Sequence, residues 1–258
     1  MEKQKQPIVA GVIGCGNIAR FHFAGLAKAG VRIKWICDLK REAATPWIEK
    51  TGARYTADYM DIVRDPEVGL LDVLTVSSTH SQICLAAIEA GKAVICEKTL
   101  AENAADARAI VQAADVRGTI FYTSYMKRFI PAVEQAKALL PGLGRIYSTY
   151  IRAFQCWGDL WTAMPTDGFA HTPPGGKSGV RRNYGGGILV CGGSHILDLV
   201  VFLLGRPTRV YGSVYTPPGR DYDLQATALL DTPNGTVHYE AVAHTLNRIG
   251  FLRDGWDE

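Results

Sequence analysis

The chain has 258 residues, of which 47% are hydrophobic and 21% charged, and is long enough for two modest globular domains. The net charge of +3 is too small, and the Lys and Arg residues too scattered, for a nucleic-acid-binding surface. The sequence shows no secretory signal and no apolar run that spans a bilayer. The six cysteines form no CxxC pair, which favours reduced, buried thiols in a cytoplasmic protein over disulfides or zinc ligands.

The first half of the chain alternates β-rich and helical runs. We expect strands at 8–13, 31–37, 70–76, 93–96 and 119–124, and helices at 17–29, 40–51, 81–90 and 103–117. Strands that are almost continuously apolar and separated by helices indicate a parallel sheet covered on both faces. The sequence therefore predicts an α/β doubly wound domain over residues 1–124.

The second half has a different pattern. We expect a helix at 129–140, a strand at 146–154, an irregular Gly/Pro-rich stretch at 157–184, a helix at 187–204 and strands at 208–216, 224–231 and 236–245. Strands that follow one another suggest a largely antiparallel sheet. Residues 125–258 therefore predict an α+β domain.

A glycine-rich turn, Gly14-Cys15-Gly16-Asn17-Ile18-Ala19, joins the first strand to the first helix. Gly14 permits the tight turn and Gly16 lets the backbone approach a pyrophosphate, while the helix N-terminus at Asn17 and Ile18 offers N–H groups to it. Asp38 ends the second strand, where a ribose-binding carboxylate is expected. The alternative is a plain glycine turn with a solvated Asp. A carboxylate there favours NAD, although Lys40 and Arg41 just beyond it leave NADP open.

The sequence resembles the Gfo/Idh/MocA family, which includes glucose–fructose oxidoreductase and inositol dehydrogenase. The resemblance rests on the glycine turn, on Glu97-Lys98-Thr99 in place of the family's Glu-Lys-Pro, on MKRFIPAV (126–133) and on GGGILVCGGSHILDLVVFLLGRP (185–207). It implies a Rossmann domain followed by a substrate and oligomerisation domain. It also implies that Lys98 contacts substrate and nicotinamide, that His195 is the acid/base, and that Glu97 and His80 belong to the cofactor site.

Two features depart from the family pattern. Many members carry an Asp four residues before the catalytic His, and this chain has Cys191 there, which we expect in the active-site pocket. Relatives also continue beyond the point where this sequence stops, after a turn at 247–252 that enters another strand. We therefore expect a small second domain whose uncovered sheet face pairs with another subunit, the alternative being a shortened chain.

Cys191, His195 and Asp198 share one face of the helix expected at 187–204. A histidine has the pKa of a general base, and the Lys98 ammonium would stabilise an alkoxide as it forms. A hydrogen-bonded core histidine is the alternative for His195. We expect Asp198 to be a catalytic residue that holds the tautomer of the imidazole or interacts with substrate, and anchoring of the helix to the domain is its alternative. Two glycines in this helix, Gly192 and Gly193, suggest close approach of the cofactor domain or substrate, unless the helix begins later.

The sequence thus predicts an NAD(P)-dependent enzyme that oxidises or reduces a sugar, inositol or related polyol. Tyr184 and the aromatic residues of 157–184 suit such a ligand, or alternatively a subunit contact. The remaining histidines have no ligand spacing, so we expect no metal site. A family member acting on a nonsugar carbonyl, and a nucleotide-binding sensor or scaffold without catalysis, are the alternative functions.

Overall fold

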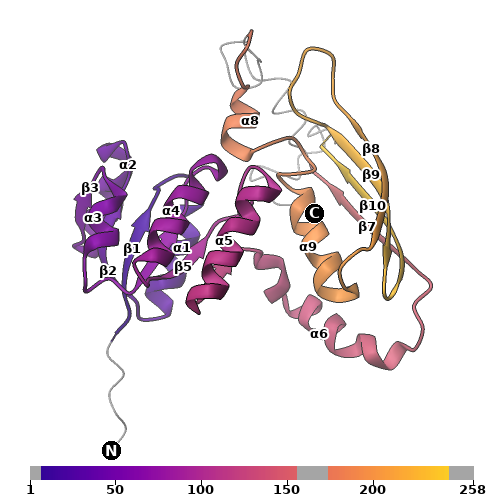
Figure 1. Ribbon diagram of the computed structural model, residues 1–258, viewed down its shortest axis with the longest axis horizontal. Helices are drawn as coiled ribbons and strands as arrows, with labels where there is room; N and C mark the ends of the chain where they lie inside the picture. The colour runs from indigo at the N-terminus through magenta and orange to yellow at the C-terminus, as the bar shows by residue number, and fades with distance from the viewer. Residues whose placement is uncertain (1–6, 156–173, 244–258) are drawn as a thin grey trace, which may run out of the picture. The chain divides into compact units, whose positions relative to one another are not determined.

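The computed structural model describes residues 7–155 and 174–243, and the chain divides into two compact units, Met1–Ser124 and Tyr125–Glu258 (Figure 1). Of the irregular stretch expected at 157–184, residues 157–173 lie outside the described residues, as does the turn at 247–252, and residues 179–184 form a short helix instead of irregular structure. Within the described ranges, no helix is long and apolar enough to cross a membrane.

The first unit alternates strands and helices as its sequence pattern predicts. Its strands are β1 (Val9–Ile13), β2 (Arg32–Cys37), β3 (Arg54–Thr56), β4 (Leu70–Val73), β5 (Ala93–Cys96) and β6 (Phe121–Thr123). Its helices are α1 (Ala19–Lys28), α2 (Arg41–Thr51), α3 (Tyr59–Arg64), α4 (Ser77–Glu89) and α5 (Ala104–Arg117). β3 and α3 are not among the elements expected from the sequence, because elements this short leave no clear hydrophobic period.

The six strands of the first unit form a parallel sheet in the order β3-β2-β1-β4-β5-β6. This is the order of a doubly wound Rossmann sheet, in which the chain changes direction between β1 and β4. The carboxyl ends of β1 and β4 therefore flank the switch point where such sheets bind ligands. The glycine-rich turn follows β1 directly.

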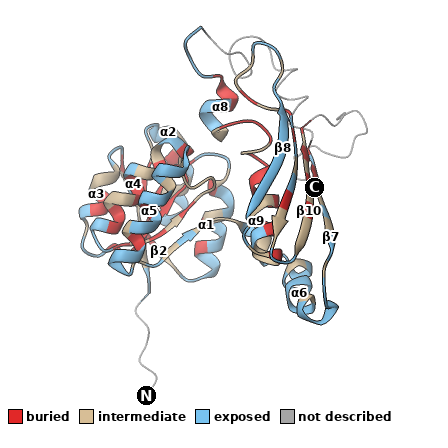
Figure 2. Ribbon diagram, turned by 45° about the vertical axis from the view of Figure 1, so that its right-hand side comes forward, coloured by how far each residue is buried: buried red, intermediate tan, exposed pale blue. Residues whose placement is uncertain are grey.

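Two buried clusters hold helices against opposite faces of this sheet. One joins sheet residues to apolar side chains of α3, α4 and α5, and the other joins them to α1 and α2. Phe23 of α1 and Trp47 of α2 stack with ring centroids 4.2 Å apart. Figure 2 shows buried residues both in the sheet and on the helices around it, as expected for apolar strands that helices cover on both faces.

The second unit begins with helices and ends with strands. Its elements are η1 (Met126–Phe129), α6 (Pro131–Leu139), η2 (Leu140–Leu143), β7 (Ser148–Phe154), α8 (Gly179–Tyr184), α9 (Gly193–Leu204), β8 (Arg209–Tyr215), β9 (Gln225–Thr232) and β10 (Gly235–Val242). The helix expected at 129–140 starts later because Ile130, which precedes Pro131, is extended, as residues before proline usually are.

The four strands of the second unit form a mixed sheet in the order β7-β10-β9-β8. β8, β9 and β10 are antiparallel neighbours, as consecutive strands usually are, but β7 pairs with β10 in parallel. The chain returns from β7 to β10 through α9 and two further strands, a long crossover of the kind that parallel pairing requires. The buried face of the sheet packs on α9 around Val237, Tyr239 and Ala241.

The helix expected at 187–204 begins only at Gly193, so Cys191 precedes it and does not share a helical face with His195. The later start is the alternative that the sequence left open for Gly192 and Gly193. A Cβ on Gly192 would lie 2.0 Å from the Gln155 side chain, and one on Gly193 2.2 Å from the Tyr239 hydroxyl. Side chains from the unit's own sheet, at the end of β7 and in β10, therefore approach the helix start closely at both glycines.

Candidate active site

In the turn after β1, neighbouring backbone crowds the first glycine, Gly14, whereas the space beside the second, Gly16, is free. Gly14 has φ +101°, and a Cβ there would lie 2.9 Å from the backbone of Leu74, so only glycine fits without strain. A Cβ on Gly16 would meet no atom within 4 Å, and no side chain in the described structure caps α1 at Ile18. Open space over Gly16 beside uncapped helical N–H groups fits a dinucleotide pyrophosphate.

Asp38 is held at the carboxyl end of β2, against the glycine turn. One carboxylate oxygen accepts a hydrogen bond from the backbone N–H of Cys15 at 2.8 Å, and the other accepts one from the N–H of Lys40 at 2.8 Å. The Tyr55 hydroxyl donates to the Asp38 carbonyl, and the Arg41 guanidinium lies over the Tyr55 ring. This places the predicted ribose-binding carboxylate next to the predicted pyrophosphate turn, as dinucleotide recognition requires.

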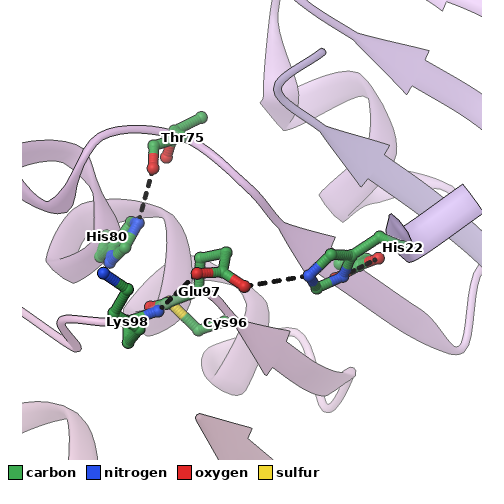
Figure 3. A network of polar contacts seen from close by, with 7 residues as sticks. His22, Thr75, His80, Cys96, Glu97 and Lys98 are labelled. Carbon is green, nitrogen blue, oxygen red and sulfur yellow. Dashed lines mark hydrogen bonds and ion pairs between the residues drawn. The ribbon is translucent and has the colours of Figure 1, made fainter. Parts of the chain in front are cut away.

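The Glu97-Lys98-Thr99 segment follows β5, and hydrogen bonds hold it at both ends. The buried ring of His80 in α4 binds the carbonyl oxygens of Thr75 and Thr99, each at 2.9 Å, and so joins the loops after β4 and β5. The Lys98 N–H donates to the Glu97 carboxylate at 3.1 Å, and the Lys98–Thr99 peptide bond is cis. Figure 3 shows the Lys98 side chain extending from this network in the direction of His80.

His22 is not among the residues that the sequence pattern singles out, although its imidazole bridges two carboxylates in this region. Its Nδ1 lies 3.0 Å from both Asp72 oxygens, and its Nε2 lies 3.0 Å from Glu97 Oε1 (Figure 3). The signal that points to such a residue is Asp72 itself, a fully buried acid inside the apolar strand β4, because a buried charge requires a partner.

The remaining candidate residues lie in the second unit. His195 is buried in the first turn of α9, where the Tyr125 ring meets it edge-on at a centroid distance of 5.9 Å. Cys191 is also buried and lies just before the helix. Tyr184, at the end of α8, packs on the same core as Cys191, and burial together with that thiol raises the pKa of the tyrosine. The structure thus gathers three of the predicted residues around the start of α9.

Asp198 points to a different partner. Arg128 of η1 donates from Nε to one Asp198 oxygen at 2.7 Å and from Nη2 to the other at 2.5 Å. This bidentate ion pair fixes α9 to η1, and the same guanidinium lies 5.2 Å from the Phe202 ring centroid. The geometry favours the helix-anchoring interpretation of Asp198 over contact with the imidazole.

In the part of the chain that the structure describes, no group of three or more His, Cys, Asp or Glu residues is arranged to hold a metal ion.

Comparison with known proteins gives relatives that are dehydrogenases. The chain is 28% identical to levoglucosan dehydrogenase of Pseudarthrobacter phenanthrenivorans over 78% of its own length and 52% of the relative's. It is 35% identical to inositol 2-dehydrogenase 2 of Saccharopolyspora erythraea over 53% of its own length and 41% of the relative's. The chain thus spans about half the length of these relatives.

Solved structures show the same fold. A levoglucosan dehydrogenase in complex with NADH and levoglucosan superposes with a TM-score of 0.82 at 25% identity, over 94% of this chain and 69% of the other. The WlbA dehydrogenase of Bordetella pertussis, in complex with NADH and UDP-GlcNAcA, superposes with a TM-score of 0.80 at 23% identity, over 94% and 69% of the two chains.

Two family models match consecutive parts of the chain. The model described as "Oxidoreductase family, NAD-binding Rossmann fold" matches residues 8–125, which include the glycine turn, Asp38 and Lys98. The model described as "GFO/IDH/MocA C-terminal domain" matches residues 143–247, which include Cys191 and His195. Together with the Rossmann strand order, these matches confirm the resemblance: the chain belongs to the Gfo/Idh/MocA family of NAD-binding oxidoreductases.

Proposed function

We propose that this protein is a dehydrogenase that transfers a hydride between NAD and a hydroxyl or keto group of a sugar, inositol or related polyol. The observation that carries the proposal is the fixed Glu97-Lys98-Thr99 segment, which follows β5 at the carboxyl edge where the glycine turn and Asp38 also lie. Relatives named for levoglucosan and inositol oxidation support the polyol class.

The glycine turn, Asp38 and the start of α1 would hold the dinucleotide, since the space over Gly16 is open and the Asp38 carboxylate is fixed beside it. When bound, NAD supplies the hydride acceptor. We assign His195 the role of base for the substrate hydroxyl proton, because an imidazole accepts a proton near neutral pH. We assign the Lys98 ammonium the role of stabilising the negative charge that develops on the same oxygen. Cys191 and Tyr184, near the start of α9, are assigned to the substrate site.

The fixed Asp38 carboxylate predicts a preference for NAD over NADP. A 2′-phosphate would meet a carboxylate whose two oxygens already accept backbone hydrogen bonds. Repulsion between the 2′-phosphate and the Asp38 carboxylate should make NADP bind about tenfold more weakly than NAD, a difference of about 1.4 kcal/mol. Calorimetry on the wild type measures both affinities. Asp38→Asn should narrow that difference, whereas Glu42→Gln, which removes an exposed acid from the first turn of α2, should preserve it.

A wild-type preference for NADP would contradict this assignment and would make Lys40 or Arg41 the residue that decides between the cofactors. An equal narrowing in both variants would mean that the general charge of this edge, not the position of Asp38, sets the preference.

We also propose that the outer face of the second sheet pairs with another copy of the chain. Tyr150, His238, Leu229 and Tyr211 are register partners on the four strands and form one row across that face. The Tyr150 and His238 rings stack at 4.2 Å, and Tyr150 and Tyr211 are 68% and 65% exposed. Apolar rows of this kind on an open sheet are usually covered by a partner surface.

Light scattering at increasing concentration should therefore show a dimer or larger assembly. Tyr211→Lys places a charge at the β8 end of the row and should shift the population to monomer without unfolding it. Gln135→Lys, which adds the same single positive charge to an exposed position of helix α6, should leave the assembly intact. A wild type that stays monomeric throughout would contradict the proposal.

The five cysteines in the described ranges are all buried free thiols. They support our proposal that the protein works in a reducing compartment such as the cytoplasm.

A further inference from the structure

His22 connects the helix of the cofactor turn to the segment that carries Lys98. It lies in the first turn of α1, directly after the glycine turn. Its side chain is 15% exposed and lies between Asp72 of β4, which is fully buried, and Glu97, which is 12% exposed. Figure 3 shows the imidazole and the Glu97 carboxylate joined end to end. Residues separated by 50 and 75 positions in sequence are thus tied together at the edge of the sheet.

Both ring nitrogens of His22 face carboxylate oxygens at 3.0 Å. Ionised carboxylates only accept hydrogen bonds, so the ring satisfies both partners as the imidazolium, which donates from both nitrogens. Burial of the ring lowers its pKa, but the hydrogen bonds to Asp72 and Glu97 and the attraction of both charges outweigh burial and raise the pKa to about 9. His22 is therefore a cation at neutral pH.

The Glu97 carboxylate divides its two oxygens between His22 and the backbone of Lys98. Oε1 accepts from the His22 ring at 3.0 Å, and Oε2 accepts from the Lys98 N–H at 3.1 Å. His80 holds the far side of the segment through the Thr99 carbonyl. Loss of the His22 contact removes the donor that holds Oε1, and with it a restraint on the Glu97 rotamer whose Oε2 meets the Lys98 N–H.

We propose that His22 is a positioning residue: it fixes the Glu97 carboxylate, which in turn fixes the backbone at Lys98 and the starting point of its ammonium group. This inference rests on the proposed function of Lys98. Its rival is a purely structural role, in which His22 only neutralises the buried charge of Asp72. The two roles differ in whether removing that buried charge makes His22 dispensable.

The test compares His22→Asn, Asp72→Asn and the double variant H22N/D72N. The measurements are hydrogen exchange of the Lys98 amide, equilibrium unfolding, and steady-state kinetics with NAD and a polyol. His22→Asn should lower stability, because it leaves Asp72 buried without its cation. It should also speed exchange of the Lys98 amide and lower kcat by about tenfold to a hundredfold, the cost of a small misplacement of a reacting group, with little change in NAD affinity.

The double variant decides between the two roles. It removes the buried charge together with the cation, so it should regain much of the lost stability while Lys98 amide exchange stays fast and kcat stays low. It also carries the test if His22→Asn alone does not fold. Recovery of slow Lys98 exchange and of kcat together with stability would overturn the proposal, as would a His22→Asn variant with unchanged Lys98 exchange.

Failure of the proposed function gives a different result. A wild type that turns over no polyol counts against the dehydrogenase assignment, while exchange of the Lys98 amide still reports, without any substrate, whether His22 holds Glu97 and the peptide that follows it.

Discussion

His195→Ala should lower kcat by about 10²–10⁴-fold, the usual cost of removing a positioned acid/base, and leave NAD affinity nearly unchanged. The imidazole is buried in the first turn of α9 beside Tyr125, so its orientation is restricted before any ligand arrives. The residues proposed to hold the dinucleotide belong to the other unit, which explains why binding should survive. Stopped-flow and steady-state kinetics with a polyol, together with calorimetric titration of NAD, measure both quantities.

Equilibrium unfolding of the same variant provides the control, because a buried histidine also contributes to packing. A variant that unfolds at nearly the wild-type denaturant concentration and still turns over substrate at the wild-type rate would contradict the base assignment. His195 would then be a core histidine, which is the alternative that the sequence alone leaves open.

Lys98→Met should lower kcat by about 10²–10³-fold, because one preorganised group that stabilises a developing oxyanion commonly contributes that much. Methionine keeps most of the length of the side chain and removes the charge. The hydrogen bond from Lys98 to the Glu97 carboxylate is donated by the backbone N–H of Lys98, so the substitution should leave it intact. Lys28→Met removes the same charge from the exposed last turn of α1 and should leave kcat unchanged.

The kinetics of Lys98→Met also separate binding from catalysis. A rise in KM with kcat unchanged would mean that Lys98 binds ground state and transition state equally, contrary to the role assigned to it. Equal losses in kcat and kcat/KM would support stabilisation of the transition state.

The sequence predicts best what short local patterns determine. The glycine turn, the apolar strands β1, β2, β4 and β5, and the acid at Asp38 each leave a signal within a few residues, and the structure places them as expected. The sequence predicts the second sheet less completely, because the parallel pairing of β7 with β10 joins chain segments that lie far apart in sequence.

Long-range contacts account for what the sequence does not predict. His22 contacts partners 50 and 75 residues away in sequence, and its spacing to the other histidines does not point to either partner. The space beside Gly192 and Gly193 is occupied by the side chains of Gln155 and Tyr239, which approach from the sheet of the same unit. Residue types alone favour a helix through this region, whereas in the structure turns come first and the helix begins at Gly193.

The central claim is that the protein transfers a hydride to NAD from a polyol. Absorbance of reduced nicotinamide, followed while the wild-type protein and NAD are mixed with inositols, levoglucosan and related sugars, tests this claim most directly. We predict a rise in absorbance with at least one polyol, abolished or strongly slowed in both His195→Ala and Lys98→Met. A wild type that binds NAD by calorimetry but gives no reduction with any polyol in the panel would contradict the claim and favour a nucleotide-binding sensor or a nonsugar carbonyl substrate.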